Sequence, residues 1–191
     1  MILRDKKFIR FIIIFAAVFA GCYYGALFIT GIAVPGGSYS PFMEKYLNVT
    51  AWLRSSLMFG TKLFLNIFGT ETYRESEYVL RATGGKGIRL VYGCLGFGVM
   101  SFWTAYISAT VANVSKKIAW FFGGLFLIWF INVIRLSMVL QAQISNWHFP
   151  FGWDHHTWFN ITSYLVIFVM MYFFERDIKM KKEIKSPATS F

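Results

Sequence analysis

Charged residues are scarce in this sequence: they make up 15% of its 191 residues, against about 25% in soluble globular domains. Hydrophobic residues account for 57% and aromatic residues for 20%. This composition excludes a disordered chain and argues against a soluble globular domain. The few charges are mostly basic, with 19 Lys and Arg against 9 Asp and Glu. An apolar, basic chain suggests a membrane protein first and a nucleic-acid-binding protein second.

Cysteine is also rare, because Cys22 and Cys94 are the only two in the chain. Two cysteines cannot form a disulfide framework. Three catalytic signatures are missing from the sequence: the C-x-x-C of thiol-oxidising enzymes, the G-x-S-G of rhomboid-type serine proteases, and the H-E-x-x-H of zinc proteases. The residues that could bind a metal are grouped in one segment: His148, Asp154, His155 and His156. Adjacent histidines rarely chelate one ion well, so we predict neither a metal nor another cofactor.

Long apolar segments dominate what is present. Four of them, 8–30, 91–112, 118–140 and 157–174, are close to the roughly 20 residues that a membrane-spanning helix needs. Helices are expected because backbone polar groups in lipid must be satisfied internally, and the alternating pattern of a β-barrel is absent. The sequence therefore predicts an all-α membrane protein, a single domain over 1–191 built as a four-transmembrane-helix bundle.

The segment 31–90 differs in composition and is predicted to lie outside the membrane. Residues 50–69 have an amphipathic pattern but carry Arg54 and Lys62, which favours an interfacial or re-entrant helix over a fifth span. Residues 77–92 alternate on both sides of a glycine-rich turn, which is typical of a β-hairpin. The insert is thus expected to add an extracytoplasmic interfacial helix and a short β-hairpin.

Basic residues set the orientation of the four spans. With an even number of crossings, eleven Lys and Arg fall in short flanks on one side and seven are spread over the insert on the other. Short basic flanks mark the cytoplasmic side. Both termini are then cytoplasmic, and the excess positive charge is explained by topology, so we predict no nucleic-acid partner.

Three polar residues are predicted to lie at one depth. At about 1.5 Å per helical residue, Cys94 is about 33 Å above Lys116, and Arg135 is about 27 Å above Lys117. His156 is about 28 Å above Glu175 by the same measure. Because the hydrocarbon core is about 30 Å thick, all three are expected near the outer interface, on three different helices.

These three residue types match the needs of nucleophilic catalysis. A thiol, a proton donor or acceptor, and a group that holds an oxyanion are required, and Cys94, His156 and Arg135 supply them. Each also has a plain alternative: a packed thiol, a solvated histidine, or an arginine reaching toward headgroups. Asn132, one turn from Arg135, could orient it, and Asp154 could set the histidine tautomer or simply be solvated. Cys22 lacks a polar partner at its depth and is predicted to pack.

The order of these motifs resembles the exosortase/archaeosortase family of integral-membrane cysteine proteases and transpeptidases. Gly-Cys-x-Gly at 93–96 follows a glycine-turned hairpin, Asn-x-x-Arg at 132–135 lies on the next helix, and a histidine opens the last helix. The resemblance covers roughly residues 50–174. Two positions depart from the family: Leu95 stands where Ser is frequent after the cysteine, and Asn160 where Gly is frequent after the histidine.

The resemblance implies that Cys94, Arg135 and His156 are catalytic, with His155 as the alternative histidine. It implies a protein substrate with a C-terminal tail made of a short motif, a transmembrane helix and a basic cluster. Processing would take place at the extracytoplasmic face of the cytoplasmic membrane, in contact with lipid. The competing class is a non-enzymatic membrane protein, such as a small transporter or assembly subunit, that would use Arg135 for anion binding or structure. Interrupted midplane helices and repeats, typical of transporters, are not seen.

Overall fold

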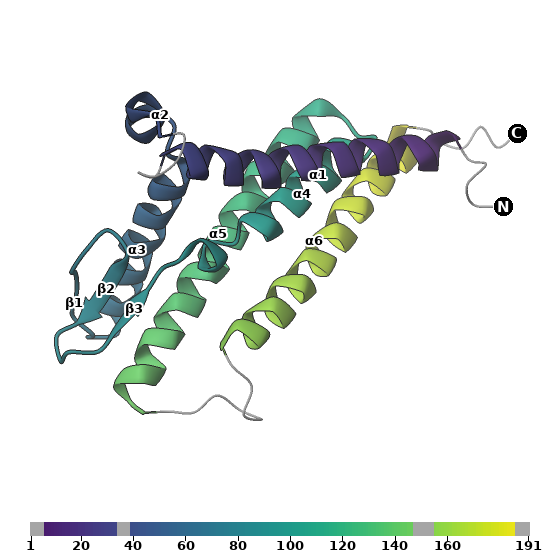
Figure 1. Ribbon diagram of the computed structural model, residues 1–191. Helices are drawn as coiled ribbons and strands as arrows, with labels where there is room; N and C mark the ends of the chain where they lie inside the picture. The colour runs from purple at the N-terminus through teal and green to yellow at the C-terminus, as the bar shows by residue number, and fades with distance from the viewer. Residues whose placement is uncertain (1–5, 34–38, 147–154, 186–191) are drawn as a thin grey trace, which may run out of the picture.

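The computed structural model describes residues 6–33, 39–146 and 155–185, with the backbone alone for 155, 156, 159 and 180–185. The described chain is mostly helical, with one small sheet (Figure 1). The elements in chain order are α1 (Lys6–Ala33), α2 (Pro41–Tyr46), α3 (Val49–Ile67), β1 (Thr72–Arg74), β2 (Val79–Ala82), β3 (Gly87–Arg89), η2 (Tyr92–Cys94), α4 (Phe97–Ala109), α5 (Val114–Ile144) and α6 (His155–Lys185).

Two helices in the described part of the chain, α1 and α5, are long and apolar enough to cross a membrane by length and composition. They contain the predicted spans 8–30 and 118–140. α1 has 28 residues, about 42 Å at the usual helical rise, and most of its side chains are exposed. α5 has 31 residues and is half buried against its neighbours. The two predictions of long apolar helices here are therefore confirmed.

The prediction of a continuous helix over 91–112 is wrong. α4 occupies only Phe97–Ala109, and its 13 residues span about 20 Å, short of the roughly 30 Å hydrocarbon core. The chain before it forms the short 3-10 turn η2, and Gly96 caps α4 in the left-handed region with φ of 80°. Hydrophobicity marked the segment correctly as apolar, but this glycine separates the turn from the helix.

The predicted hairpin is present and belongs to a slightly larger sheet. β2 and β3 are antiparallel, with Leu80 opposite Ile88, and the turn between them uses Gly85 with φ of 94°. A third strand that the sequence analysis missed, β1, pairs with β2 so that Tyr73 lies opposite Arg81. Three residues are too few to show an alternating pattern, which explains why β1 was not predicted.

The predicted amphipathic helix over 50–69 is α3, and its inner face packs on α5. Asn48 caps it by accepting a hydrogen bond from the Ala51 N–H at 3.0 Å. The contact with α5 is close at Gly60, where a Cβ atom would lie 2.8 Å from both Trp129 and Val133 side chains. A glycine at this point therefore sets how closely α3 approaches the middle of α5.

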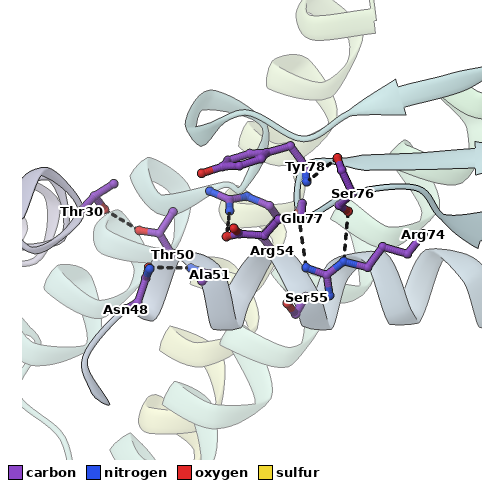
Figure 2. A network of polar contacts seen from close by, with 10 residues as sticks. All are labelled: Thr30, Asn48, Thr50, Ala51, Arg54, Ser55, Arg74, Ser76, Glu77 and Tyr78. Carbon is purple, nitrogen blue, oxygen red and sulfur yellow. Dashed lines mark hydrogen bonds and ion pairs between the residues drawn. The ribbon is translucent and has the colours of Figure 1, made fainter. Parts of the chain in front are cut away.

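A polar network ties the sheet to α3 and α3 to α1. Figure 2 shows Arg54 of α3 donating to the Glu77 carboxylate before β2, at 2.8 Å. The guanidinium of Arg54 also lies over the Tyr78 ring, 4.0 Å from its centroid, a cation–π geometry. One turn before Arg54, the hydroxyl groups of Thr30 and Thr50 hydrogen-bond, which joins α3 to the last turns of α1. Arg54 is one of the two charges that favoured an interfacial position for this helix. In the structure it is 6% exposed and paired with Glu77.

Two hydrophobic cores divide the molecule, and α5 contributes to both. The sheet-end core joins α3, the sheet, the Cys94 turn and the second half of α5: Leu57, Met58, Leu65, Leu80, Ala82, Ile88, Leu90, Leu95, Val133, Leu136, Val139 and Leu140. The aromatic-end core joins α4, α6 and the first half of α5: Trp103, Tyr106, Ile107, Ile128, Met170 and Phe174. Phe11 and Phe15 of α1 pack against this second core. α5 and α6 lie side by side, and α1 crosses them in the view of Figure 1 while packing along α4.

Candidate active site

Cys94 ends the turn η2, directly after the hairpin and before α4. Its N–H donates to the Val91 carbonyl at 2.9 Å, and the N–H of Leu95 donates to the Tyr92 carbonyl at 3.1 Å. Leu90 and Leu95 are fully buried in the sheet-end core. These two anchors hold the turn against α5, so that Cys94 is 7% exposed and its backbone position is determined by the hairpin.

Asn132 and Arg135 of α5 both contact this turn. The Asn132 side-chain amide donates to the Cys94 carbonyl at 3.0 Å. Nη1 of Arg135 is 3.4 Å from the same carbonyl oxygen and 3.4 Å from Oδ1 of Asn132. Asn132 is fully buried and Arg135 is 8% exposed. The structure therefore brings three of the predicted site residues together in a buried cluster.

The contacts of this cluster show what each group can do. Asn132 and Arg135 hold the carbonyl oxygen of Cys94, which fixes the backbone of the thiol-bearing residue. The guanidinium is a permanent cation, and it contacts the backbone carbonyl of the residue that bears the thiol. Burying such a charge in a largely apolar core costs free energy unless the charge is hydrogen-bonded. The hydrogen bonds of Arg135 to the Cys94 carbonyl and to Asn132 reduce that cost.

The height of 33 Å predicted for Cys94 assumed a continuous helix and does not hold, although Arg135 contacts the Cys94 carbonyl. The amine of Lys117 donates to the Ser108 carbonyl at 2.9 Å, which places the end of α4 level with the start of α5. From Ser108, α4 rises only about 17 Å to Phe97, and the residues before it are not α-helical. Cys94 therefore lies lower than the predicted 33 Å. The two residues meet because the turn packs sideways against α5.

The histidine part of the predicted site is not tested by the structure. α6 begins at His155, but the side chains of His155 and His156 are outside the described residues, as are His148 and Asp154 altogether. Asn160, one helical turn after His156, lines the same cavity as Gly93 and Gly96 on either side of Cys94. Within the described residues, no three His, Cys, Asp or Glu side chains cluster to hold a metal.

A cavity of about 630 Å³ opens beside Cys94, between α1, α4 and α6. This size lies within the range of ligand pockets, about 300–1,000 Å³. Residues from four elements, the turn η2 included, line it, among them Phe19, Tyr23, Tyr92, Gly93, Phe97 and Asn160. The sequence analysis did not assign Tyr23 or Tyr92 to the site.

A usable signal for Tyr23 was present in the sequence. Phe11, Phe15, Phe19 and Tyr23 recur every four residues, and their rings stack in succession along α1. Residues four apart lie on one face of a helix, so this spacing marks the face of α1 that packs on α4. Cys22 lies outside this face and is exposed, so the prediction that it packs is wrong.

Searches for similar proteins give no family assignment: no family model, no curated protein and no solved structure matches the chain.

Proposed function

We propose that this protein is a membrane-embedded cysteine protease or transpeptidase of the exosortase/archaeosortase type, acting on proteins with a tripartite C-terminal tail. The observation that carries the proposal is the buried clamp on Cys94. Asn132 and Arg135, from a different helix, both bind the carbonyl of that one residue. A cysteine that only fills space needs no buried arginine beside it, whereas a thiolate nucleophile and its oxyanion do.

In the proposal α1, α5 and α6 cross the membrane, α4 together with the Cys94 turn before it makes the fourth crossing, and both termini are cytoplasmic. Contacts at one end of the bundle support this topology. Lys116, at the start of α5, pairs with Asp177, near the end of α6, at 2.6 Å, and the Tyr106 hydroxyl donates to Glu175 at 2.9 Å. The first turns of α1 and the end of α6 lie at this same end of the molecule (Figure 1). The short basic flanks therefore gather on one side, as the positive-inside rule requires.

The sheet, α3 and the Cys94 turn would then lie at the extracytoplasmic face. Contacts at the far end of α5 support this placement, because Thr70 donates to Gln141 at 3.2 Å and Lys86 to Asn146 at 2.6 Å. α4 is short, so the turn that follows the sheet lies inside the outer part of the bundle rather than at its rim. The nucleophile is thus expected in a protein-lined site that a membrane-anchored substrate can reach.

The proposed reaction begins with attack of the Cys94 thiolate on the carbonyl carbon of the scissile peptide. The electron pair of the C=O bond moves to oxygen, and the guanidinium of Arg135, with its planar set of donors, stabilises this oxyanion. When the tetrahedral intermediate collapses, the C–N bond breaks. His156, or His155, donates its proton to the departing amine. The new chain end remains as a thioester on Cys94.

A second nucleophile completes the reaction. A water molecule, an amine or a hydroxyl attacks the thioester carbonyl, the C–S bond breaks, and the thiolate returns. The neutral histidine accepts the proton that the attacking group loses, which restores its acid form. Asn132 acts as a positioning residue throughout, because it holds both the Cys94 carbonyl and, through Oδ1, Arg135.

The test is co-expression with a tagged tripartite-tail protein from the same genome, followed by mass spectrometry of its C terminus. We expect a trimmed terminus with the unmodified protein and none with Cys94→Ala, because no thioester can form. Cys22→Ala is the matched control, since Cys22 is exposed on α1, and it should process normally. Membrane levels of the variants are compared by blotting. Processing that persists in Cys94→Ala would overturn the proposal and favour a non-enzymatic role.

A further inference from the structure

The cavity beside Cys94 changes character along its length. Its polar lining groups are Tyr92 beside Cys94, Tyr23 of α1, and Asn160 and Tyr164 of α6. Within the described residues, the buried hydroxyl of Tyr92 has no hydrogen-bond partner. Apart from Tyr164, which lies one turn after Asn160, the lining deeper along α4 and α6 is apolar, with Phe102 and Ile167. A ligand that fits this cavity is polar at the Cys94 end and apolar beyond it.

The length of the cavity suits about two turns of a helix. Along α6 it extends from Asn160 to Phe168, eight residues or about 12 Å. At about 3.6 residues per turn, a helical segment of this length has slightly more than two turns.

The walls and floor of the cavity suit such an occupant. Tyr164 and Phe168 are 58% and 68% exposed, so the cavity opens sideways between α1 and α6. Gly93 and Gly98 lie on its floor. A Cβ atom on Gly93 would meet nothing within 4 Å, and one on Gly98 would only touch Tyr23 at 3.8 Å. Small residues let a neighbouring helix approach closely within a membrane.

We propose that this cavity binds the first two turns of the substrate's own transmembrane helix, so that the residues preceding that helix lie at Cys94. The inference rests on the proposed function and adds to it the place where the tail binds. A chain that passes from a polar motif into an apolar helix matches the polarity of the cavity. Cleavage would then occur at a fixed distance before the helix, because the bound helix determines which peptide bond reaches the thiol.

Photo-cross-linking tests the location. Benzoylphenylalanine replaces Phe168 in the cavity or Phe122 on the outer face of α5; the two native side chains are 68% and 64% exposed. The protein carries Cys94→Ala so that the tagged tripartite-tail probe is not consumed. We expect cross-links to the tail helix at position 168 at least about tenfold above those at 122. Equal yields at both positions, or adducts with lipid alone at 168, would overturn the inference.

Filling the cavity gives the second test. Gly98→Leu projects a side chain into it, whereas Gly21→Leu adds the same side chain on the exposed side of α1, where a Cβ meets nothing within 4 Å. With Cys94 present, we expect processing to fall at least about tenfold in Gly98→Leu, since small displacements of a substrate cost large factors in rate, and to be unchanged in Gly21→Leu. If Gly98→Leu does not accumulate, the cross-linking result decides.

The two proposals fail in different ways. Cys94-dependent processing with no selective cross-link at 168 would leave the proposed function intact and remove the docking site. A selective cross-link at 168 without any processing by the unmodified protein would keep the docking site and remove the proposed enzyme activity.

Discussion

The sheet-end core and the aromatic-end core are built by different means. The aromatic-end core consists of large rings shared by helices, with Trp103 and Phe174 fully buried. The sheet-end core is aliphatic and joins strands to helices, and it contains the buried polar residues Arg54, Asn132 and Arg135. The polar contacts of the aromatic-end core, such as Tyr106 with Glu175 at 2.9 Å and Trp103 with the Trp120 carbonyl at 3.2 Å, are made by the edges of the rings. The polar contacts at the sheet end specify a single arrangement, and that is where Cys94 lies.

The difference predicts that polar substitutions at the sheet end reduce activity more than stability. Arg135→Lys keeps the charge but loses the planar fork of donors. Loss of one oxyanion donor costs about 10²–10³ in rate elsewhere, and we expect a similar fall in processing here. The measurement is the initial rate of tail processing at matched membrane levels. Wild-type rates in Arg135→Lys would contradict a role for the guanidinium in catalysis.

At the aromatic end, the largest stability effect is expected from a single methyl group. In Gly124→Ala the new Cβ would lie 2.1 Å from Nε1 of Trp103 and 2.6 Å from Cε of Met170. Overpacking costs about 1–3 kcal/mol, and we expect the upper end, about 3 kcal/mol, because the indole also donates to the Trp120 carbonyl at 3.2 Å and cannot easily move.

Thermal unfolding in detergent measures this effect. A loss of about 3 kcal/mol corresponds to a fall in Tm of about 6–12 °C for a chain of this size. Gly123→Ala is the control, since its Cβ would meet nothing within 4 Å and Tm should be unchanged. Equal Tm values for the two variants would show that α4 and α5 are less closely packed than described.

The Arg54–Glu77 pair should respond asymmetrically. The Arg54 side chain is 7% exposed, whereas that of Glu77 is 50% exposed. Glu77→Gln leaves a buried cation without its counter-ion, which we expect to cost about 2 kcal/mol, below the 3–5 kcal/mol of fully buried pairs. Arg54→Met removes the buried charge itself and leaves a half-exposed carboxylate, so the loss should be about 1 kcal/mol or less.

The same detergent assay, with Tm measured at two salt concentrations, distinguishes the two variants. If Arg54→Met proves the more damaging, its cation–π contact with Tyr78, rather than its charge, is what binds the sheet to α3.

The smallest effect is expected for Cys22→Ala. Cys22 is exposed on α1 and belongs to neither core, so Tm and processing should both stay close to those of the unmodified protein, within about 0.5 kcal/mol in stability. A large loss in either would show that this face of α1 contacts a partner that the isolated chain lacks.

Local patterns in the sequence were sufficient for several parts of the fold. Long apolar runs predicted α1 and α5, and the glycine turn between alternating residues predicted the β2–β3 pair. The i+3 spacing of Asn132 and Arg135 correctly placed them on one face of α5. Each of these features depends on residues close together in the chain, so composition and period report them directly.

Other features depended on information that is not local. The continuous helix over 91–112 failed because hydrophobicity does not reveal the conformation of Gly96. The pairing of Arg54, which favoured an interfacial helix, was not predicted because its partner, Glu77, is 23 residues away. The histidines and Asp154 of the predicted site lie in segments whose side chains are not described, so their roles stay predictions.

The sequence by itself determined the long apolar helices, the grouping of many basic residues in short flanks, and the presence of an arginine inside an apolar helix. Only the tertiary structure decided that Asn132 and Arg135 bind the carbonyl of Cys94 and that α1, α4 and α6 enclose a cavity beside it. The physical reason is that helix formation depends on neighbours along the chain, whereas the site is formed where a turn after a sheet packs sideways on a helix some 40 residues later. Such packing depends on how all the side chains in the sheet-end core fill space together.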